Sequence, residues 1–328
     1  MTMDEVQDAT LAAALLAEGR ALMADPATAG RGMQRIVDAA HQGSGEASHL
    51  VSLLAAADGA AAERWVYALA YLGRAAKAGH APSQKTLAFL AGDEAALARL
   101  ERGEDLSHPD CHRLHDAIDV AAWLGTPGQR VLSAAPRIAV AENFLPGRVC
   151  DWIIARARPH LARAQVYDPR NGGGSTAAIR TNSEMRFGFE ILDLVLVFVT
   201  QRIAGLTGLD PRGMEPPSVL HYEVGQEFRP HHDYLDPAVP AYAAETARIG
   251  QRVATLLIYL NDGFEGGETH FPLTGLRFKG RKGDALLFHN VLPGGAPDPI
   301  TLHAGLAPAR GEKWLFSQWI RDKRLPLT

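Results

Sequence analysis

A strand-like alternation marks the stretch Lys313-Trp314-Leu315-Phe316-Ser317-Gln318-Trp319 near the C-terminus. A period of two places Lys313, Leu315, Ser317 and Trp319 on one face of a β-strand. Other short runs of β-type residues, separated by turn residues, lie upstream at 137–140, 218–222, 252–260, 268–271, 284–289 and 301–305. Many short strands of this kind predict a sandwich or barrel of antiparallel strands.

Helical patterns accompany these strands. Residues 146 to about 164 form an amphipathic pattern that starts at a proline, and residues 189–206 predict a second helix. Runs of strands that follow helices, rather than alternating with them, indicate the α+β class. We expect residues 126–328 to form one domain of this class.

Residues 1–125 are rich in alanine and leucine at helical spacing and predict an all-α domain. An internal echo runs through this part, because Ala39-Ala40-His41-Gln42-Gly43 recurs as Ala75-Ala76-Lys77-Ala78-Gly79. The two copies begin 36 residues apart (75 − 39), a period that is typical of helical repeats. The glycine at the end of each copy suits the end of a helix. The segment resembles Sel-type repeats, a tetratricopeptide-like family, while a generic helical bundle stays open. Either arrangement offers a surface for a partner or a neighbouring domain.

The composition argues against several classes of protein. Of 328 residues, 47% are hydrophobic and 21% charged, and the net charge of −4 argues against nucleic acid or an anionic membrane as the main partner. Cys111 and Cys150 lie outside any CxxC spacing, so neither a disulfide framework nor a thiolate zinc site is indicated. The acidic N-terminus lacks the pattern of an export signal, and no apolar stretch is long enough to span a bilayer. We therefore expect a soluble, cytoplasmic protein.

Two His-x-Asp motifs occur in the chain, at His108-Pro109-Asp110 and at His231-His232-Asp233. The first lies in a polar link with a central proline and is interpreted as a turn. In the second, strand alternation turns His231 and Asp233 to one face, where both can bind one metal ion while His232 points away. His303, in a later strand-like run, would complete the set of two histidines and one carboxylate that holds non-haem Fe(II). The histidines that compete for this role are His221, His270 and His289.

Lys313 follows His303 at a distance of ten residues and opens a strand face that is otherwise largely apolar. A lysine at the inner end of such a strand is unfavourable without an anionic partner. We predict that Lys313 binds the distal carboxylate of an acidic cosubstrate, 2-oxoglutarate, whose keto-acid end would chelate iron. The alternative is that its ammonium group reaches water at the barrel mouth.

Several segments of the second half occur in a distinctive order. They are Tyr222-Glu223-Val224-Gly225-Gln226, Pro230-His231-His232-Asp233, Arg252-Val253-Ala254-Thr255-Leu256-Leu257-Ile258-Tyr259-Leu260, Glu265-Gly266-Gly267-Glu268-Thr269, Gly283-Asp284-Ala285-Leu286, Asp298-Pro299-Ile300-Thr301-Leu302-His303-Ala304 and Gly311-Glu312-Lys313-Trp314. Together they resemble the catalytic domain of prolyl 4-hydroxylases, which are Fe(II)/2-oxoglutarate dioxygenases, from about residue 137 to 322. The resemblance implies a double-stranded β-helix, a jelly-roll barrel flanked by helices.

The resemblance also implies a role for seven residues. The implied iron ligands are His231, Asp233 and His303. Lys313 is implied to pair with the distal carboxylate of 2-oxoglutarate, Tyr222 and Thr255 to hydrogen-bond this cosubstrate, and Trp319 to lie on the substrate side. If the resemblance is set aside, Tyr222 and Trp319 could equally be aromatic residues of the core, and Thr255 an ordinary threonine of a strand.

The implied reaction is hydroxylation, since relatives that transfer halide replace the carboxylate at Asp233 with a small residue. Such an enzyme consumes O2 and 2-oxoglutarate, releases succinate and CO2, and admits ascorbate as a reductant. The implied target is C4 of a peptidyl proline, as in procollagen-proline 4-dioxygenases, with the repeats recruiting a protein substrate. Two alternatives stay open: the same chemistry on another amino-acid side chain or a peptide natural product, and a repeat-based binding protein with a vestigial oxygenase domain.

Three glycine- or proline-containing stretches are expected to be irregular. Residues 234–251 and 171–175 are candidate lids, because long links beside an active site often close over it. Glu265-Gly266-Gly267-Glu268 is expected to form a turn whose glycines serve backbone geometry.

Overall fold

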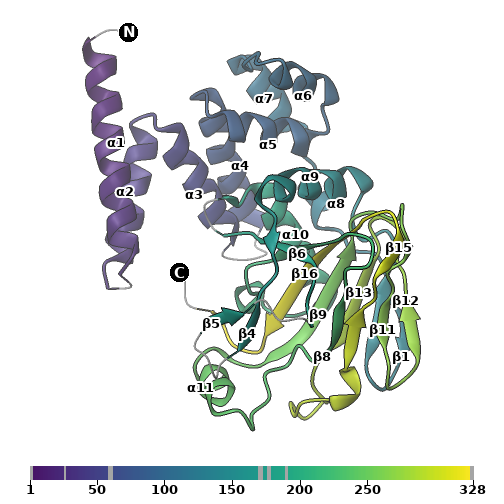
Figure 1. Ribbon diagram of the computed structural model, residues 1–328. Coiled ribbons are helices and arrows are strands. Elements are labelled where there is room, and N and C mark those ends of the chain that lie inside the picture. Colours follow the sequence, from purple (N-terminus) through teal and green to yellow (C-terminus); the bar gives the residue numbers. More distant parts are fainter. Residues whose placement is uncertain are drawn as a thin grey trace. The chain divides into compact units, whose positions relative to one another are not determined.

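The computed structural model describes residues 3–25, 27–57, 62–168, 173–175, 179–188 and 191–325. The chain divides into two compact units, coloured along the sequence in Figure 1. The first unit is built from Met1–Gly125 with Leu192–Arg202, and the second from Thr126–Ile191 with Ile203–Leu327. Among the described residues, no helix combines the length and apolarity that crossing a bilayer requires.

The first unit is helical, as predicted. Its helices are α1 (Met3–Met23), α2 (Ala29–His41), α3 (Gly45–Ala57), α4 (Ala62–Lys77), α5 (Ala81–Ala91), α6 (Glu94–Glu101), α7 (His108–Asp116) and α8 (Val120–Leu124). The two copies of the echo end α2 and α4 in the same way, with Gly43 and Gly79 at φ of +89° and +78°. In both turns the residue after the glycine donates its backbone N–H back into the helix, as Ser44 N does to Ala39 O at 3.1 Å.

One segment from the second half of the sequence completes the first unit. Helix α10 (Leu194–Thr207) carries Phe198, whose ring stacks on Trp65 with centroids 3.8 Å apart and packs against Trp123 at 5.3 Å. All three residues belong to the first unit. The helix predicted at 189–206 is therefore present from Leu194, and residues 189 and 190 lie outside the described part.

Two local predictions on helices are wrong. His108-Pro109-Asp110 is not a turn but the start of α7, where Ser107 and Asp110 form a capping box: each side chain accepts a hydrogen bond from the other residue's backbone N–H. The helix predicted to reach about residue 164 ends earlier, because α9 covers only Gly147–Ala157. Pro159 has no N–H to donate to an α-helical hydrogen bond, so the chain continues as a short 3-10 turn, η1 (Arg158–His160), in which Arg158 keeps helical backbone angles.

The second unit is built around two antiparallel sheets, drawn as arrows in Figure 1. The larger has the order β1 (Arg130–Ser133), β2 (Ile138–Ala141), β13 (Ala285–His289), β9 (Arg252–Tyr259), β16 (Lys313–Arg321), β7 (Ser218–Tyr222), β6 (Ser183–Arg186) and β3 (Ala162–Arg163). The smaller has the order β12 (Leu276–Phe278), β11 (Thr269–Phe271), β14 (His303–Gly305) and β8 (Phe228–His231). One core joins side chains of both sheets, including Tyr222, Leu257 and Leu315 from the larger and Phe271 from the smaller. The predicted jelly-roll barrel in an α+β chain is confirmed.

Short elements fill the edges of the barrel. They are the pairs β10 (Glu265–Gly266) with β15 (Pro308–Arg310) and β4 (Val166–Asp168) with β5 (Gly173–Ser175), helix α11 (Pro240–Ile249), and the 3-10 turns η3 (Pro211–Gly213) and η4 (Pro299–Thr301). The stretch 234–251 is thus partly helical, because Pro240 suits the first turn of a helix. Gly266 and Gly267 each have a φ of +70°, so the backbone role expected for them is confirmed, although Glu265–Gly266 also pairs as a strand. Of the candidate lid 171–175, residues 171 and 172 lie outside the described part.

Candidate metal centre

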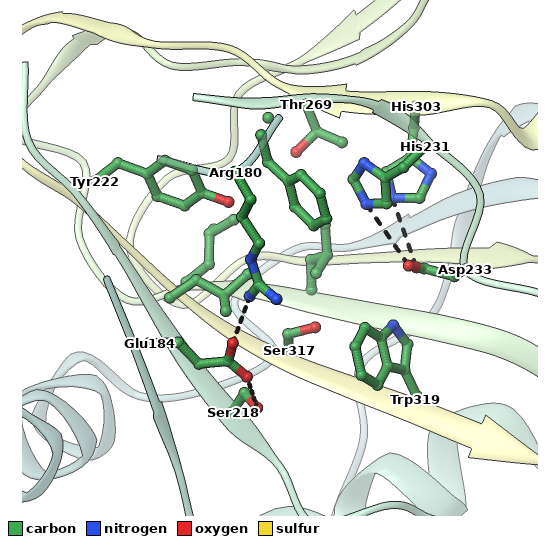
Figure 2. Close-up of a pocket in the computed structure, with 15 residues that line it drawn as sticks. Arg180, Glu184, Ser218, Tyr222, His231, Asp233, Thr269, His303, Ser317 and Trp319 are labelled. Atoms are coloured by element: carbon green, nitrogen blue, oxygen red, sulfur yellow. Dashed lines mark hydrogen bonds and ion pairs between the residues drawn. The ribbon is translucent and has the colours of Figure 1, made fainter. Parts of the chain in front are cut away.

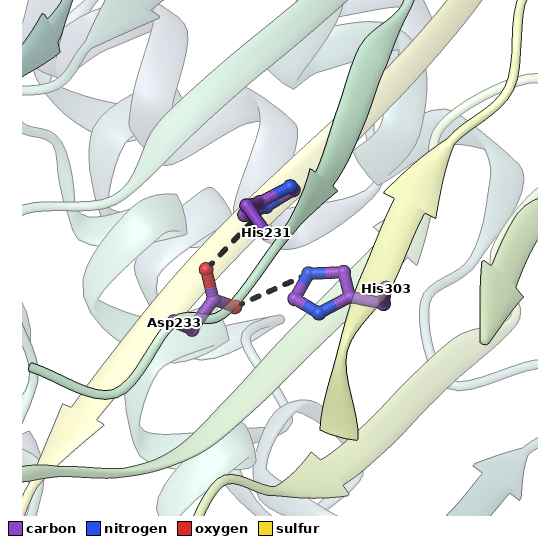
Figure 3. Close-up of side chains that lie close together, drawn as sticks. All are labelled: His231, Asp233 and His303. Atoms are coloured by element: carbon purple, nitrogen blue, oxygen red, sulfur yellow. Dashed lines mark ion pairs between the residues drawn. The ribbon is translucent and has the colours of Figure 1, made fainter. Parts of the chain in front are cut away.

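Three potential metal ligands converge where β8 and β14 pair (Figure 3). His231 ends β8, Asp233 follows two residues later, and His303 begins β14 directly opposite His231 in the strand register. One ligand atom from each residue lies within 4.8 Å of the other two. The His231 Nε2 and His303 Nε2 atoms are 3.7 and 3.5 Å from the carboxylate oxygens of Asp233. Within the described residues, no other group of three histidine, cysteine, aspartate or glutamate side chains is gathered so closely.

The neighbours of both imidazoles fix which nitrogen is free. His231 Nδ1 lies 2.8 Å from the Arg229 carbonyl oxygen, and His303 Nδ1 lies 3.0 Å from that of Thr301. A carbonyl only accepts, so each Nδ1 carries the proton and donates, which leaves each Nε2 lone pair for a metal ion. The ring of Phe228 stacks on His231 at 3.5 Å and holds its plane.

The charges of the three residues suit Fe(II). Burial, reinforced by the adjacent His303, lowers the pKa of His231 to about 3, so its ring is neutral at pH 7. Burial by itself would raise the pKa of Asp233, but His303, His231 and the hydroxyl of Thr255 outweigh it and hold that pKa below its ordinary value. Two imidazoles and one carboxylate are the donor set of non-haem Fe(II) sites with open positions.

The competing histidines lie elsewhere. His221, next to Tyr222 on β7, donates from Nε2 to Glu312 Oε2 at 2.8 Å and packs on Trp314, on the opposite strand face from Tyr222. His270 is on β11 and His289 ends β13, and neither joins the cluster of three. Strand context therefore separated the metal ligands from the other histidines.

Lys313 is buried without a partner. Its side chain is 0% exposed, and its Nζ atom makes no hydrogen bond to any described residue. Nζ lies 4.9 Å from the centre of the Tyr222 ring and 5.8 Å from that of Tyr259. Burial lowers the pKa of Lys313 to about 7, because nearby rings replace water around the ammonium group. An enclosed cation of this kind needs an anion, so Lys313 does not extend to water and fits the distal carboxylate of 2-oxoglutarate.

The pocket beside the metal ligands is drawn in Figure 2, and Lys313 is not among the residues that line it. Tyr222 and Trp319, both predicted site residues, line it together with the three metal ligands. Thr255 does not line it, because its hydroxyl donates to Asp233 Oδ2 at 2.7 Å; a direct bond from Thr255 to 2-oxoglutarate stays a prediction. Thr269 takes a place in the wall instead, with its hydroxyl 2.9 Å from that of Tyr259. This residue was missed, although it ends the Glu265–Thr269 segment.

Two charged residues of the pocket carry no clear signal in the sequence. Arg180, only 5% exposed, pairs with Glu184 at 2.8 Å and lies over the Phe228 ring at 4.7 Å. Both Arg180 and Glu184 line the pocket. Glu184 reaches it from β6, which pairs with β7 in the larger sheet, and Arg180 forms an isolated bridge to Phe228. No local pattern reveals either pairing.

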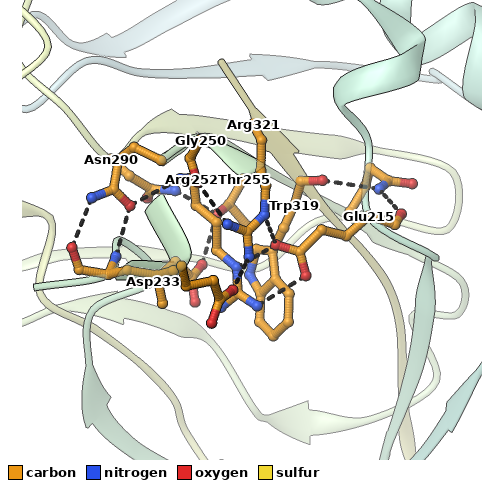
Figure 4. A network of polar contacts seen from close by, with 12 residues as sticks. Glu215, Asp233, Gly250, Arg252, Thr255, Asn290, Trp319 and Arg321 are labelled. Atoms are coloured by element: carbon orange, nitrogen blue, oxygen red, sulfur yellow. Dashed lines mark hydrogen bonds and ion pairs between the residues drawn. The ribbon is translucent and has the colours of Figure 1, made fainter. Parts of the chain in front are cut away.

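Trp319 is held from behind by a network of charges (Figure 4). The guanidinium carbon of Arg252 lies 3.7 Å from the centre of the Trp319 ring, and Arg252 pairs with Glu215 at 2.6 Å. Glu215 also pairs with Arg321 at 2.7 Å. Burial alone would raise the pKa of Glu215, but Arg252 and Arg321 outweigh it and lower that pKa, which keeps the network charged at pH 7.

Comparison with known proteins gives the following matches. Residues 217–321 match the 2OG-Fe(II) oxygenase superfamily. Probable prolyl 4-hydroxylase 3 of Arabidopsis thaliana is 36% identical over 228 residues, which are 62% of this chain and 77% of the relative. Prolyl 4-hydroxylase 1 of the same plant is 36% identical over 229 residues, 62% of this chain and 79% of the relative. The viral collagen prolyl hydroxylase of Paramecium Bursaria Chlorella virus-1, solved as a 2OG complex, is 26% identical with a TM-score of 0.43, covering 56% of this chain and 95% of that one.

Proposed function

The chain belongs to the prolyl 4-hydroxylase family, and from this premise we propose that it hydroxylates C4 of a prolyl residue in a peptide or protein. It is a dioxygenase that uses Fe(II), 2-oxoglutarate and O2 and releases succinate and CO2. The observation that carries the proposal is the combination of His231, Asp233 and His303 with the unpartnered, buried Lys313 in one barrel.

Each residue of the site has a separate task. His231 Nε2, His303 Nε2 and the Asp233 carboxylate bind iron, which supplies the oxidising power that breaks a C–H bond. Lys313 fixes the far carboxylate of 2-oxoglutarate, and the Tyr222 ring beside it excludes water. Burial of these groups limits the access of water, so that the oxidant reacts with the bound substrate rather than in side reactions.

The wall around Trp319 supports a prolyl substrate. Its indole is a flat apolar surface, backed by Arg252, and suits packing against the compact, apolar pyrrolidine ring. Leu315 and Ser317 from the same face of β16 also line the pocket and leave room beside Trp319. We assign this face to the prolyl ring.

The first unit has a separate proposed role. We propose that it recruits the protein substrate, as helical repeats commonly bind partners. On α4, Val66 and Tyr67 are exposed and offer apolar contacts for an extended chain. We also propose a reducing, cytoplasmic location, in keeping with the two free, buried thiols Cys111 and Cys150.

The test is turnover on defined peptides. The purified protein is incubated with Fe(II), 2-oxoglutarate, air and peptides that contain proline, and both succinate and peptide mass are measured. We expect succinate together with one added oxygen atom on a prolyl C4, lost in His231→Ala and kept in His160→Ala, a change of an exposed histidine outside the site. Oxygen found on another residue would select the second candidate function, the same chemistry on a different side chain. No oxygen transfer to any peptide, and no Fe(II) binding, would contradict both.

A further inference from the structure

A buried hydrogen-bond chain lies behind Asp233 (Figure 4). Asn290 Nδ2 is 2.9 Å from Thr255 Oγ1, and Thr255 Oγ1 is 2.7 Å from Asp233 Oδ2. Asn290 is 0% and Thr255 1% exposed, so water does not compete for these bonds. Removing one member of such a buried chain leaves its partner unsatisfied.

The chain has a direction. An amide nitrogen only donates, so the Thr255 oxygen accepts from Asn290 and its single hydroxyl proton points to Asp233. Oδ2 of Asp233 thus accepts one hydrogen bond, while Oδ1 takes none from the described residues. The hydroxyl on Oδ2 therefore restrains the rotation of the carboxylate and leaves both lone pairs of Oδ1 for a metal ion.

Both supporting residues are held by the larger sheet. Thr255 lies in the centre of β9, opposite Trp319 on β16 and Phe288 on β13. The backbone of Asn290 is fixed on both sides, because its N–H donates to Val253 O at 2.9 Å and its carbonyl accepts from Asp298 N at 3.0 Å. Asp233, by contrast, follows the end of β8 and has no strand partner of its own. The rigid sheet thus orients the Asp233 side chain, whose own backbone is not held by strand pairing.

We propose that Asn290 and Thr255 are positioning residues that fix the rotation of the Asp233 carboxylate and thereby set the affinity of the site for its metal ion. Thr255 then acts through the metal ligand and not on 2-oxoglutarate. The proposal rests on the metal site alone and does not depend on which substrate is hydroxylated.

The first experiment measures metal affinity without cosubstrate. Co(II), whose visible absorption reports its coordination, is titrated into the full-length protein and its variants. We expect Thr255→Val, which keeps the shape but removes the hydroxyl, to bind Co(II) about 10- to 100-fold more weakly, as is typical when a partner of a metal ligand is lost. Thr255→Ser should restore near-normal binding. Thr86→Val is the matched control, since this buried threonine bonds only to Pro82 O within its own helix.

The second experiment tests whether the two residues act in series. Asn290→Leu should weaken Co(II) binding less than Thr255→Val. In Asn290→Leu the Thr255 hydroxyl can still donate to Asp233, and only the Asn290 amide that orients this hydroxyl is lost. In the double variant the loss should equal that of Thr255→Val alone, whereas independent effects would add. If Thr255→Val does not fold, as circular dichroism would show, Asn290→Leu alone still tests the chain.

Two outcomes would overturn the proposal. Co(II) binding and absorption unchanged in Thr255→Val, with weakened 2-oxoglutarate binding, would place Thr255 on the cosubstrate. Additive losses in the double variant would show that Asn290 and Thr255 act independently. Neither result would bear on the prolyl substrate, which peptide turnover tests separately.

Discussion

The two His-x-Asp motifs have the same residues at the same spacing and do different work. His108 and Asp110 lie in the first turn of α7, where Asp110 caps the helix and its carboxylate pairs with Arg99 at 3.3 Å. His231 and Asp233 lie at the end of β8, where His303 from β14 stands opposite and completes a metal site. The two motifs differ in the residues that the tertiary structure places beside them. A change at the first should therefore alter stability, and a change at the second should alter turnover.

The largest contrast comes from removing one histidine of each motif. His231→Ala should leave no measurable succinate production, because the two remaining ligands would bind Fe(II) only weakly. His108→Ala should retain normal turnover, since its ring only contacts the Lys77 carbonyl oxygen on the surface. Succinate release, with Fe(II) binding measured in parallel, checks both. Loss of activity in His108→Ala would remove the contrast between the motifs.

The next effect is on the cosubstrate. Lys313→Met keeps the apolar stem and removes the buried charge, so 2-oxoglutarate binding should weaken by about 2–5 kcal/mol, the usual result of truncating one partner of a buried charge pair. Metal binding without 2-oxoglutarate should stay normal, since Lys313 is not among the metal ligands. Titration of each ligand separately is the measurement. Equal weakening of both would mean that Lys313 supports the whole barrel.

A smaller effect depends on pH. With a pKa of about 7 in the free protein, Lys313 loses its proton as the pH rises above 7, whereas the bound carboxylate would keep it protonated. The affinity for 2-oxoglutarate should thus be highest below pH 7, where Lys313 is protonated, and should fall by up to about tenfold per pH unit above it. Lys313→Arg, which stays charged, should flatten this profile. A wild-type profile that is already flat above neutral pH would contradict the shifted pKa.

The smallest change concerns the first motif. Asp110→Ala removes one half of the capping box and should destabilise the first unit by about 1 kcal/mol. Turnover of the folded protein should not change. Thermal unfolding followed by circular dichroism gives the stability, and succinate release gives the control. A fall in turnover that exceeds the loss of folded protein would link α7 to catalysis.

Much of this site could be predicted because its signals are local. Alternation along β16 placed Lys313 and Trp319 on one face. The His-x-Asp spacing brought His231 and Asp233 together as expected, although β8 ends at His231 and Asp233 lies beyond the strand. The parts that could not be predicted depend on pairing between distant segments. Thr255 reaches Asp233, and not the pocket, only because β9 passes behind the end of β8. Glu184 enters the pocket wall through the pairing of β6 with β7, which the sequence does not specify locally.

The errors in helix prediction have a different origin. The start of α7 had a readable signal, Ser107 three residues before Asp110, which was outweighed by Pro109. Proline is in fact well tolerated in the first turn of a helix, where its missing N–H has no partner to lose. Inside a helical pattern the same residue ends it, as Pro159 does after α9.

The place of Phe198 between Trp65 and Trp123 bears on how this chain can be cut or recombined. A fragment that stops at Gly125 would lack the ring that covers both indoles, and a fragment that starts at Thr126 would carry that ring without them. Either piece would present large aromatic side chains to water and tend to aggregate. The two units are therefore interleaved in sequence rather than joined end to end. A chimera that exchanges the helical unit for that of another protein would have to carry residues 192–202 with it.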